Sequence, residues 1–292
     1  MAAYTRVGAV TGANKGIGLA IVRQLALQYP KSAYNNGPLL IYLTARNEER
    51  GKAALESLHS DPQLTQAKAL RSQGGLTDVK YHPLDIDNTQ SIRDFASFLK
   101  KEHPQGIDFL INNAGIALQG FDIDVVKKTL HCNYYGTLEA TQQILPHIKD
   151  GGRLVNVASM VGHLTSQYSN SIRSRFLQAQ KPEDITQLME KFTSEVAEGK
   201  HEKNWPSSAY AVSKAGIIGM TKTIARQNAD SGSKTLINCC CPGYVNTDMT
   251  KGRGTKTPDE GAQTPVLLAI GDIKDSNGDF WQNERKIDWA KA

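Results

Sequence analysis

The sequence contains one tyrosine–lysine pair whose spacing suits proton transfer. Of the ten tyrosines in the chain, only Tyr210 has a lysine four residues further on, Lys214. On a helix, residues four apart share a face. A lysine ammonium one turn from a phenol stabilises the phenolate and lowers its pKa from about 10. The pattern therefore predicts that Tyr210 donates a proton to a carbonyl oxygen near neutral pH. An exposed helix pair or a packed tyrosine is the alternative.

A glycine-rich turn near the start of the chain favours binding of a dinucleotide. It runs from Thr11 to Gly18 as Thr-Gly-Ala-Asn-Lys-Gly-Ile-Gly, between an expected strand and an expected helix. Gly12 allows a tight turn, Gly16 lets backbone approach phosphate, and Gly18 permits close helix packing. A pyrophosphate would bind at the amino terminus of that helix. The spacing is Gly-x3-Gly-x-Gly, and no Gly-Lys-Ser/Thr follows, so the turn is not a P-loop. A simple connecting turn is the alternative.

Two cations indicate which dinucleotide is preferred. A site for NAD places Asp or Glu after the second strand, to hold the ribose 2′-hydroxyl. This sequence has Thr44-Ala45-Arg46 there, and an arginine suits the 2′-phosphate of NADP through bidentate contacts. Lys15, inside the glycine-rich turn, adds a second positive charge. We expect NADP(H); two solvated surface cations are the alternative.

The bulk composition is that of a globular protein. The 292 residues are 39% hydrophobic and 22% charged, enough for one large α/β domain or two small ones. The net charge of +5 is not concentrated in a Lys/Arg run, so the sequence gives little support for nucleic-acid binding. A mild positive excess suits an anionic cofactor.

Cysteine usage and hydropathy indicate a reducing compartment. The four cysteines are Cys132 and the run Cys239-Cys240-Cys241, and three adjacent cysteines do not match the spacing of a metal site. We expect reduced thiols packed in the core, and no bound metal. The opening residues do not resemble a signal peptide, and no apolar run reaches the ~20 residues that span a bilayer. These observations predict a cytoplasmic protein.

Apolar strand-like runs alternate with helical patterns along the chain. This alternation, with continuously apolar strands, predicts a doubly wound, mostly parallel α/β sheet of the Rossmann type. The predicted strands are Val7–Thr11, Leu39–Thr44, Val79–Leu84, Ile107–Ile111, Arg153–Ala158 and Leu236–Cys241. The predicted helices are Gly16–Tyr29, Glu48–His59, Thr89–Lys101 (capped by Asn88), Asp124–Leu145 and Ser208–Asp230, whereas Asp61–Thr77 is expected to be helix and loop, without a strong signal.

Polar motifs follow the predicted strands, where ligands of such sheets bind. The motifs are Gly12, Arg46, Asp85, Asn113, Ser159 and Pro242-Gly243, in the order of the six strands. Taken singly, Ser159 is an ordinary capping residue, and Asn133 satisfies backbone within its helix. Because the six motifs all follow strands at one edge of the sheet, a shared ligand site is favoured over the separate structural roles.

One segment interrupts the alternation. Residues 160–206 separate the fifth predicted strand from the helix that bears Tyr210. Within it, Ile185, Leu188, Met189 and Phe192 fall at helical spacing, after a helix start at Pro182. We expect an inserted amphipathic helix, ending near residue 199, that packs beside the site. The whole chain, residues 1–292, is predicted to form a single domain with this insert inside it.

Taken together, these motifs resemble the short-chain dehydrogenase/reductase family. The resemblance covers nearly the whole chain and rests on Thr11-Gly12-x3-Gly16-x-Gly18, Asn112-Asn113-Ala114-Gly115, Asn133, Ser159, Tyr210-x3-Lys214 and Pro242-Gly243. The subfamily that it resembles most is the monomeric NADPH-dependent carbonyl reductases, on Thr44-Ala45-Arg46, Pro206-Ser207-Ser208-Ala209-Tyr210, Cys240-Cys241-Pro242-Gly243 and the long insert.

The resemblance implies a role for each matching residue. It implies a catalytic tetrad of Asn133, Ser159, Tyr210 and Lys214, in which the serine polarises the carbonyl, the tyrosine donates the proton, the lysine also holds the nicotinamide ribose, and the asparagine supports a water chain. The implied cofactor contacts are Gly12, Asn14, Lys15, Gly16, Ile17, Gly18, Arg46, Asp85, Ile86, Asn113, Tyr210, Lys214, Val245, Asn246 and Thr247. The implied substrate contacts are Ser159, Met160, Tyr210 and Tyr244.

Two departures from the subfamily lie near the expected pocket mouth. Tyr244 follows Pro242-Gly243 where mammalian-type carbonyl reductases carry a tryptophan, and residues 117–130 form a short segment. Both put the substrate range in doubt, and with it any glutathione-conjugate site.

We therefore predict NADPH-dependent reduction of a ketone, aldehyde or quinone by a cytoplasmic monomer that needs no membrane or nucleic-acid partner. Members of the family form dimers through the long helix Asp124–Leu145 and the helix that bears Tyr210. If the inserted helix lies over these two helices, it blocks that surface and the chain stays monomeric. Two alternatives remain at this point: oxidation of a specific secondary alcohol in biosynthesis, and a non-catalytic dinucleotide sensor on the same fold.

Overall fold

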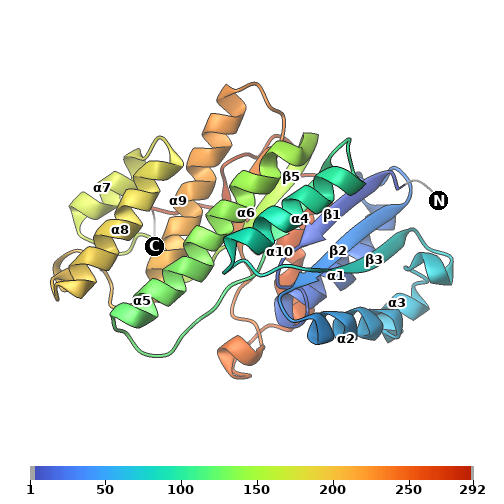
Figure 1. Cartoon of the computed structure of the whole chain (residues 1–292), viewed down its shortest axis with the longest axis horizontal. Helices are drawn as coiled ribbons and strands as arrows, with labels where there is room; N and C mark the ends of the chain where they lie inside the picture. The colour runs from blue at the N-terminus through green and yellow to red at the C-terminus, as the bar shows by residue number, and fades with distance from the viewer. Residues whose placement is uncertain (1–3, 291–292) are drawn as a thin grey trace.

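Eight strands form one sheet in the computed structural model, which describes residues 4–290 (Figure 1). Their order across the sheet is β3-β2-β1-β4-β5-β6-β7-β8. Neighbouring strands from β3 to β7 are parallel, and β8 pairs antiparallel with β7. The strands are β1 (Arg6–Val10), β2 (Leu39–Ala45), β3 (Thr77–Pro83), β4 (Ile107–Asn112), β5 (Ile148–Val157), β6 (Leu236–Cys241), β7 (Phe280–Gln282) and β8 (Arg285–Ile287).

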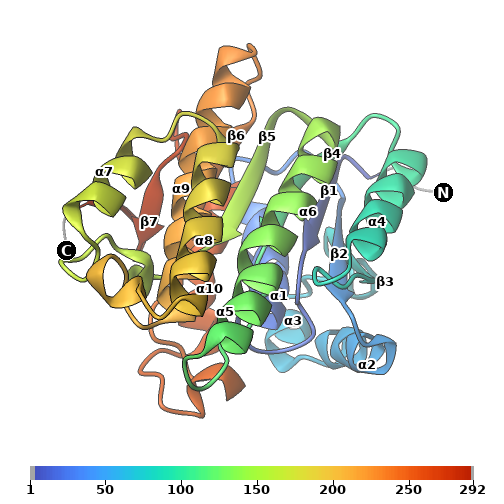
Figure 2. The ribbon, with the colours of Figure 1, turned by 60° about the vertical axis from the view of Figure 1, so that its left-hand side comes forward.

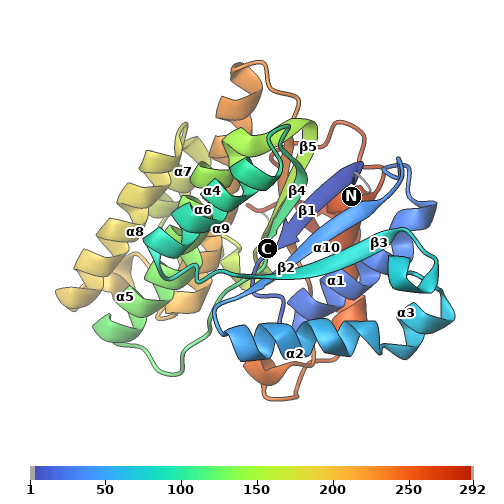
Figure 3. The ribbon, with the colours of Figure 1, turned by 45° about the vertical axis from the view of Figure 1, so that its right-hand side comes forward.

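Helices cover both faces of the sheet, with α1, α2 and α10 on one face and α4, α6 and α9 on the other (Figure 3). The helices are α1 (Gly16–Gln28), α2 (Glu48–His59), α3 (Pro62–Gln66), α4 (Thr89–Glu102), α5 (Ile123–Leu130), α6 (Thr137–Ile144), α7 (Asn170–Gln178), α8 (Pro182–Ala197), α9 (Ala209–Asp230) and α10 (Pro258–Ile270). The predicted doubly wound α/β fold is confirmed.

The side chains of β2 point alternately to the two faces of the sheet, and this explains why its sequence is continuously apolar. Leu39, Ile41 and Leu43 pack in the core under α1 and α2, whereas Leu40 and Tyr42 pack in the core under α4. Successive side chains of a strand point to opposite faces. Both faces of this sheet are covered, so every position of β2 is buried.

All six predicted strands are present, but several elements near the insert and the C-terminus were missed. β7 and β8 have three residues each, too few to show a period. α10 is buried on most of its surface and contains Pro265, which normally ends a helix. α7, inside the insert, was also not predicted, whereas α3 lies in the stretch that was expected to be helix and loop.

The prediction of one continuous helix over Asp124–Leu145 is wrong in its middle. A π-helical turn, His131–Gly136, separates α5 from α6. A Cβ atom added at Gly136 would lie 2.2 Å from the Ile86 carbonyl oxygen, so this turn passes against the loop after β3. A π turn inserts one extra residue into a helix, which local periodicity does not reveal.

The insert forms α7 and α8, and α8 ends at Ala197, near the predicted boundary. Figure 2 shows α8 alongside α9, and α5 lies next to both of these helices. Ile185, Leu188, Met189 and Phe192 of α8 are buried in a core that they share with α5 and α9. The expected packing of the insert across α5 and α9 is confirmed.

Candidate active site

The predicted site residues lie at the carboxyl ends of the parallel strands. β1 and β4 are neighbours in the sheet, and the chain leaves them toward opposite faces. A crevice opens where the strand order reverses in this way, and ligands of doubly wound sheets bind there. The glycine-rich turn follows β1, and Asn113 follows β4, so these two motifs border the crevice.

The backbone of the glycine-rich turn passes very close to its neighbours. Gly12 has a φ of +62°, and a Cβ atom there would lie 2.8 Å from Ala114 Cα. At Gly18, a Cβ atom would lie 2.4 Å from the Gly12 carbonyl oxygen. Only glycine fits both places. The turn is therefore tightly folded at the amino terminus of α1, a place that suits a pyrophosphate.

Asn113 fastens this turn to β4. Its side-chain Nδ2 donates to the carbonyl oxygens of Thr11 and Gly12, at 3.0 and 3.2 Å. In return, Thr11 Oγ1 accepts hydrogen bonds from the backbone N–H groups of Asn113 and Ala114, both at 3.0 Å. The amide of Asn113 is thus used to hold the phosphate-binding turn, a role that the sequence reasoning did not assign to it.

The two cations predicted to select NADP lie beside the crevice. Arg46 follows β2 and is exposed. Lys15 caps α1, and its Nζ lies 2.7 Å from a carboxylate oxygen of Asp248, in the loop after β6. Both members of that pair are more than half exposed, so the pair holds Lys15 only weakly. Sequence reasoning missed Asp248, because the two residues are 233 positions apart.

Asn133 lies in the π-helical turn and is fully buried. Its Oδ1 accepts a hydrogen bond from the Ile116 N–H at 2.8 Å, and its Nδ2 donates to the Ile116 carbonyl oxygen at 2.9 Å. The same amide donates to Ser213 Oγ at 3.1 Å, and Ser213 Oγ donates to the Tyr210 carbonyl oxygen at 2.8 Å. Asn133 therefore joins the loop after β4 to α9. The bridging residue Ser213 was not predicted.

Asn133 and Lys214 converge at Gly115, in the loop after β4. A Cβ atom added there would lie 3.1 Å from Asn133 Oδ1 and 3.8 Å from Lys214 Nζ. Lys214 is only 4% exposed, and its Nζ donates to the Val157 carbonyl oxygen at 2.8 Å. Burial lowers the pKa of Lys214 to about 8. The lysine thus reaches from α9 to the end of β5, directly below the crevice.

Tyr210 lies one turn before Lys214 on α9, and its ring centroid is 5.5 Å from the lysine Nζ. The predicted lowering of its pKa is wrong for the chain alone. Burial raises the pKa of Tyr210 to about 12, the nearby Cys241 adds to the rise, and the hydrogen bond with the Ser159 hydroxyl opposes it. Desolvation of the phenolate is the largest cause of this rise. The phenol therefore carries its proton at neutral pH.

Ser159 begins the short turn that follows β5. Its hydroxyl accepts a hydrogen bond from the Val161 N–H at 3.4 Å, and its carbonyl accepts one from the Gly162 N–H at 3.0 Å. These bonds form the 3-10 turn Met160–Gly162. The Ser159 hydroxyl also acts to lower the pKa of the Tyr210 phenol, so the two hydroxyls lie close to each other.

The remaining predicted cofactor residues lie in loops along the same edge. Ile86 is buried, and Asp85 Oδ1 accepts from the Asp87 N–H at 3.1 Å after β3. After β6, Val245 is buried and Thr247 approaches the glycine-rich turn, since a Cβ atom at Gly16 would lie 3.3 Å from Thr247 Cγ2. The loops after β3 and β6 thus lie on either side of the crevice.

Exposed apolar side chains lie in the loops that follow the strands next to the site. Among the described residues, five large hydrophobic side chains are strongly exposed, and four of them lie in the loops after β4, β5 and β6. These four are Leu118, Val161, Tyr244 and Met249. Met160, also predicted to contact substrate, is half-buried beside them. Exposed apolar side chains on neighbouring loops are typical of a ligand-binding rim.

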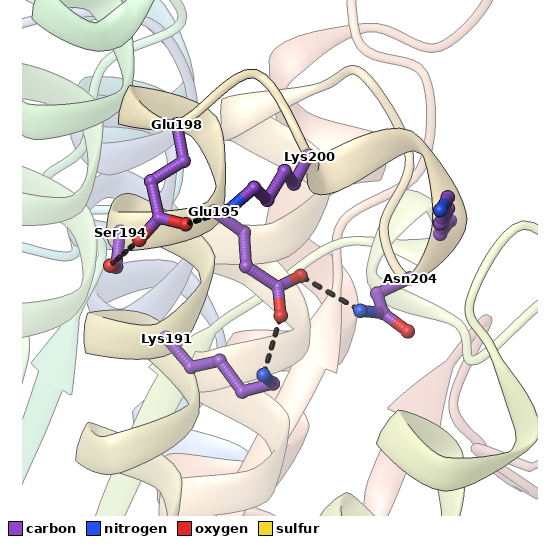
Figure 4. Close-up of a pocket in the computed structure, with 7 residues that line it drawn as sticks. Lys191, Ser194, Glu195, Glu198, Lys200 and Asn204 are labelled. Atoms are coloured by element: carbon purple, nitrogen blue, oxygen red, sulfur yellow. Dashed lines mark hydrogen bonds and ion pairs between the residues drawn. The ribbon is translucent and has the colours of Figure 1, made fainter.

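A separate hollow of about 420 Å³ lies at the C-terminal end of α8 (Figure 4). Four of its charged groups form two ion pairs, in which Glu195 lies 2.5 Å from Lys191 Nζ and Glu198 lies 2.8 Å from Lys200 Nζ. Glu195 also accepts a hydrogen bond from Asn204 Nδ2 at 2.9 Å. These contacts fasten the end of the insert. The hollow is polar and belongs to no part of the predicted site.

Two absences hold for residues 4–290. No group of three or more histidine, cysteine, aspartate or glutamate side chains is placed to hold a metal ion. No helix in this range is long and apolar enough to cross a membrane. All four cysteines are free thiols buried in the core, as predicted.

Comparison with known proteins places these features in a family. The sequence profile of the short chain dehydrogenases matches residues 6–171 and 193–258. The unmatched stretch between those two blocks falls within α7 and α8, and thus within the insert.

Full-length relatives share more than a third of their residues with this chain. Carbonyl reductase (NADPH) 1 of Mus musculus is 38% identical over 304 residues, covering 99% of this chain and 100% of its own. Carbonyl reductase (NADPH) 1 of Homo sapiens is also 38% identical, with the same coverage. Among solved structures, salutaridine reductase from Papaver somniferum superposes with a TM-score of 0.79 at 26% identity, covering 95% of this chain and 99% of its own.

Proposed function

The chain belongs to the short chain dehydrogenase family, and from that premise we propose that it reduces ketones, aldehydes or quinones with NADPH. The observation that carries the proposal is the convergence of Asn133, Ser159, Tyr210 and Lys214 beside the glycine-rich turn. Proton donor, carbonyl-polarising hydroxyl and cofactor cradle then lie on one edge of one sheet.

Each residue of the tetrad has a part that its contacts support. The Ser159 hydroxyl, which faces the Tyr210 phenol, would donate a hydrogen bond to the substrate's carbonyl oxygen. Tyr210 would donate the proton to the same oxygen as it becomes an alcohol. Bound NADPH supplies the hydride for the carbonyl carbon. Lys214 and Asn133, both at Gly115, would keep a charge and a polar group under the phenol to support its reprotonation.

The pKa of the phenol suits a proton donor to a carbonyl oxygen. With a pKa raised to about 12, Tyr210 is protonated at neutral pH and ready to act as an acid. Alcohol oxidation would need the phenolate, which burial disfavours.

The residues present also fit NADP(H). The glycine-rich turn leaves no room for a side chain at Gly12 or Gly18, as the tight turn and the close helix packing of a dinucleotide site require. Arg46 and Lys15 provide exposed cations where the 2′-phosphate would lie. Carbonyl reductase relatives named for NADPH support the same choice. We assign Asp85, Ile86, Asn113, Val245, Asn246 and Thr247 to the rest of the cofactor site.

We further propose a single oxidoreductase domain that acts as a monomer in the cytoplasm. α8 lies over α5 and α9, and its outer side carries Glu183, Gln187 and Glu190, which are exposed. A polar outer side is poorly suited to a dimer interface. The buried free thiols are consistent with a reducing compartment.

The direct test is turnover. Purified protein is mixed with NADPH and a panel of ketones, aldehydes and quinones, and carbonyl-dependent loss of NADPH absorbance is measured. We expect several members of the panel to be reduced, with bulky apolar carbonyls favoured because of the rim of Leu118, Val161, Tyr244 and Met249. Tight NADPH binding without turnover of any carbonyl would instead indicate a non-catalytic dinucleotide sensor.

A further inference from the structure

A tryptophan close to the C-terminus contacts the turn that carries the predicted catalytic serine. Trp289 follows β8 and is only 3% exposed. Its indole Nε1 donates to the Gly162 carbonyl oxygen at 2.8 Å, a buried bond between residues 127 positions apart. The Leu164 N–H also bonds the Trp289 carbonyl oxygen, at 3.5 Å. The C-terminal segment therefore reaches back to the end of β5.

The indole is itself held in place. Its ring packs edge to face against Phe176 of α7, with ring centroids 5.6 Å apart. A Cβ atom added at Gly219 of α9 would lie 3.3 Å from Trp289 Cη2, so the ring also rests on α9. An indole fixed on two sides holds the direction of its N–H.

The turn that Trp289 holds is pressed directly onto α9. A Cβ atom at Gly162 would lie 2.7 Å from the Lys214 carbonyl carbon and 2.8 Å from the Ala215 nitrogen. At the other end of the turn, the Gly162 N–H donates to the Ser159 carbonyl oxygen at 3.0 Å. Gly162 thus lies between the indole, the backbone of α9 and Ser159, and any movement of Gly162 changes the place of the serine.

We propose that Trp289 is a positioning residue for the Ser159 hydroxyl. By holding the Gly162 carbonyl, it clamps the turn after β5 against α9 and fixes the distance between the Ser159 and Tyr210 hydroxyls. The proposal rests on the proposed carbonyl reduction, in which both hydroxyls meet one carbonyl oxygen. Misplacing a catalytic group by about 1 Å can cost up to ~100-fold in rate, so a distant clamp has a measurable effect.

The chain offers a matched control for this tryptophan. Trp281, in β7, is also buried, and its Nε1 donates to Ser276 Oγ at 3.1 Å. It packs in the core with α1 and α10, away from the Ser159 turn. Trp289→Phe and Trp281→Phe therefore each remove one buried N–H donor and shrink one buried ring, but only the first releases the clamp.

The experiment measures three quantities on the full chain: kcat and KM for a reduced carbonyl, the NADPH dissociation constant, and amide hydrogen exchange of residues 159–164. For Trp289→Phe we expect kcat to fall roughly tenfold, NADPH affinity to stay within twofold, and exchange in that segment to quicken. For Trp281→Phe, the turn should exchange as in the wild type, and kcat should change less than twofold.

A double-mutant cycle distinguishes positioning from general loosening. If Trp289 acts through Ser159, adding Trp289→Phe to Ser159→Ala should lower kcat by less than twofold, whereas independent effects would multiply. If Trp289→Phe does not fold, Phe176→Leu can replace it, because it removes the aromatic ring that packs against the indole. Phe176→Leu should lower kcat and quicken exchange at residues 159–164 in the same way, but by smaller amounts.

The proposal is overturned if exchange at residues 159–164 is unchanged, or if Trp289→Phe and Trp281→Phe lower kcat equally. The exchange measurement needs no substrate, so it decides the clamp even for an inactive protein. An inactive wild type would count against the proposed reductase function alone.

Discussion

Replacing Lys214 by methionine should stabilise the cofactor-free protein near neutral pH. The lysine is buried and its pKa is lowered to about 8, from about 10.5 for a solvated lysine. At pH 7 the folded chain must keep this ammonium out of water. A difference of about 2.5 pKa units corresponds to a destabilisation of about 3 kcal/mol. Methionine has a side chain of similar length and carries no charge.

The gain is reduced by one lost hydrogen bond. Lys214 Nζ donates to the Val157 carbonyl oxygen, and such a bond contributes about 1 kcal/mol net. The expected balance is therefore a gain of about 2 kcal/mol at pH 7, which raises the melting temperature of a chain of this size by roughly 4 °C. Activity should be lost at the same time, so stability and function would change in opposite directions.

The pH dependence has a definite sign. Below pH 8 the ammonium is charged in both states, and the destabilisation is complete. Between pH 8 and about 10.5 the folded lysine loses its proton while the unfolded one keeps it, so the wild type gains stability relative to the variant. We expect the advantage of Lys214→Met to shrink across that window and to become a disadvantage of about 1 kcal/mol above it, because the lost hydrogen bond to Val157 remains.

Urea unfolding of the apo proteins at pH 7, 8, 9 and 10 measures this difference. Lys222→Met is the matched control, since Lys222 lies two turns further along α9, is half-buried, and donates to the Gly278 carbonyl oxygen at 2.9 Å. The control should show no gain at any of these pH values. If Lys214→Met is less stable than wild type at pH 7, or if its advantage does not depend on pH, burial of the ammonium does not carry the cost that we assign to it.

Four further predictions concern catalysis, the cofactor and assembly. Tyr210→Phe should keep NADPH affinity and slow reduction by about 10²–10⁴-fold, and rates within twofold of wild type on several carbonyls would exclude the phenol as proton donor. Wild-type protein should prefer NADPH over NADH by roughly 10–150-fold in binding, and Arg46→Asp should erode or reverse that preference; equal use of both by the wild type would refute it. Asp248→Asn frees Lys15 from its ion pair, so NADPH affinity measured by titration should rise by up to about fivefold at low salt, and a fall would show that the pair helps to form the site. Light scattering on a sizing column should give one species near 31.9 kDa over a wide concentration range, whereas a stable species of two or four times that mass would mean that the insert does not prevent association.

The sequence was informative wherever a pattern repeats locally. Six parallel strands, their helices and the inserted α8 each bury a face, and burial leaves a period that can be read along the chain. The predicted site residues came together for a topological reason: the carboxyl ends of parallel strands share one edge of the sheet. Elements that are short, such as β7 and β8, or buried nearly all round, such as α10, leave no such period.

Contacts between distant residues were beyond this reasoning. Ser213 meets Asn133 across 80 positions, Asp248 meets Lys15 across 233, and Trp289 meets Gly162 across 127. Ser213, Asp248 and Trp289 belong to no motif, and each acquires its part only when the sheet is assembled. The π-helical turn at Asn133 was hidden for a related reason, since its sequence continues the pattern of the helices on either side.

The error about Tyr210 shows what the tyrosine–lysine spacing leaves out. The inference from spacing treated the two groups as if they were in water, where the ammonium would favour the phenolate. In the folded chain both groups are desolvated, and each pKa moves toward the neutral form: that of the phenol up to about 12, and that of the ammonium down to about 8. Desolvation acts on each group alone, whereas their mutual attraction requires both to be charged, so burial prevails. A buried tyrosine and lysine of this kind suit the reduction of a carbonyl. The phenol keeps its proton at neutral pH and gives it up when negative charge develops on the carbonyl oxygen of the substrate.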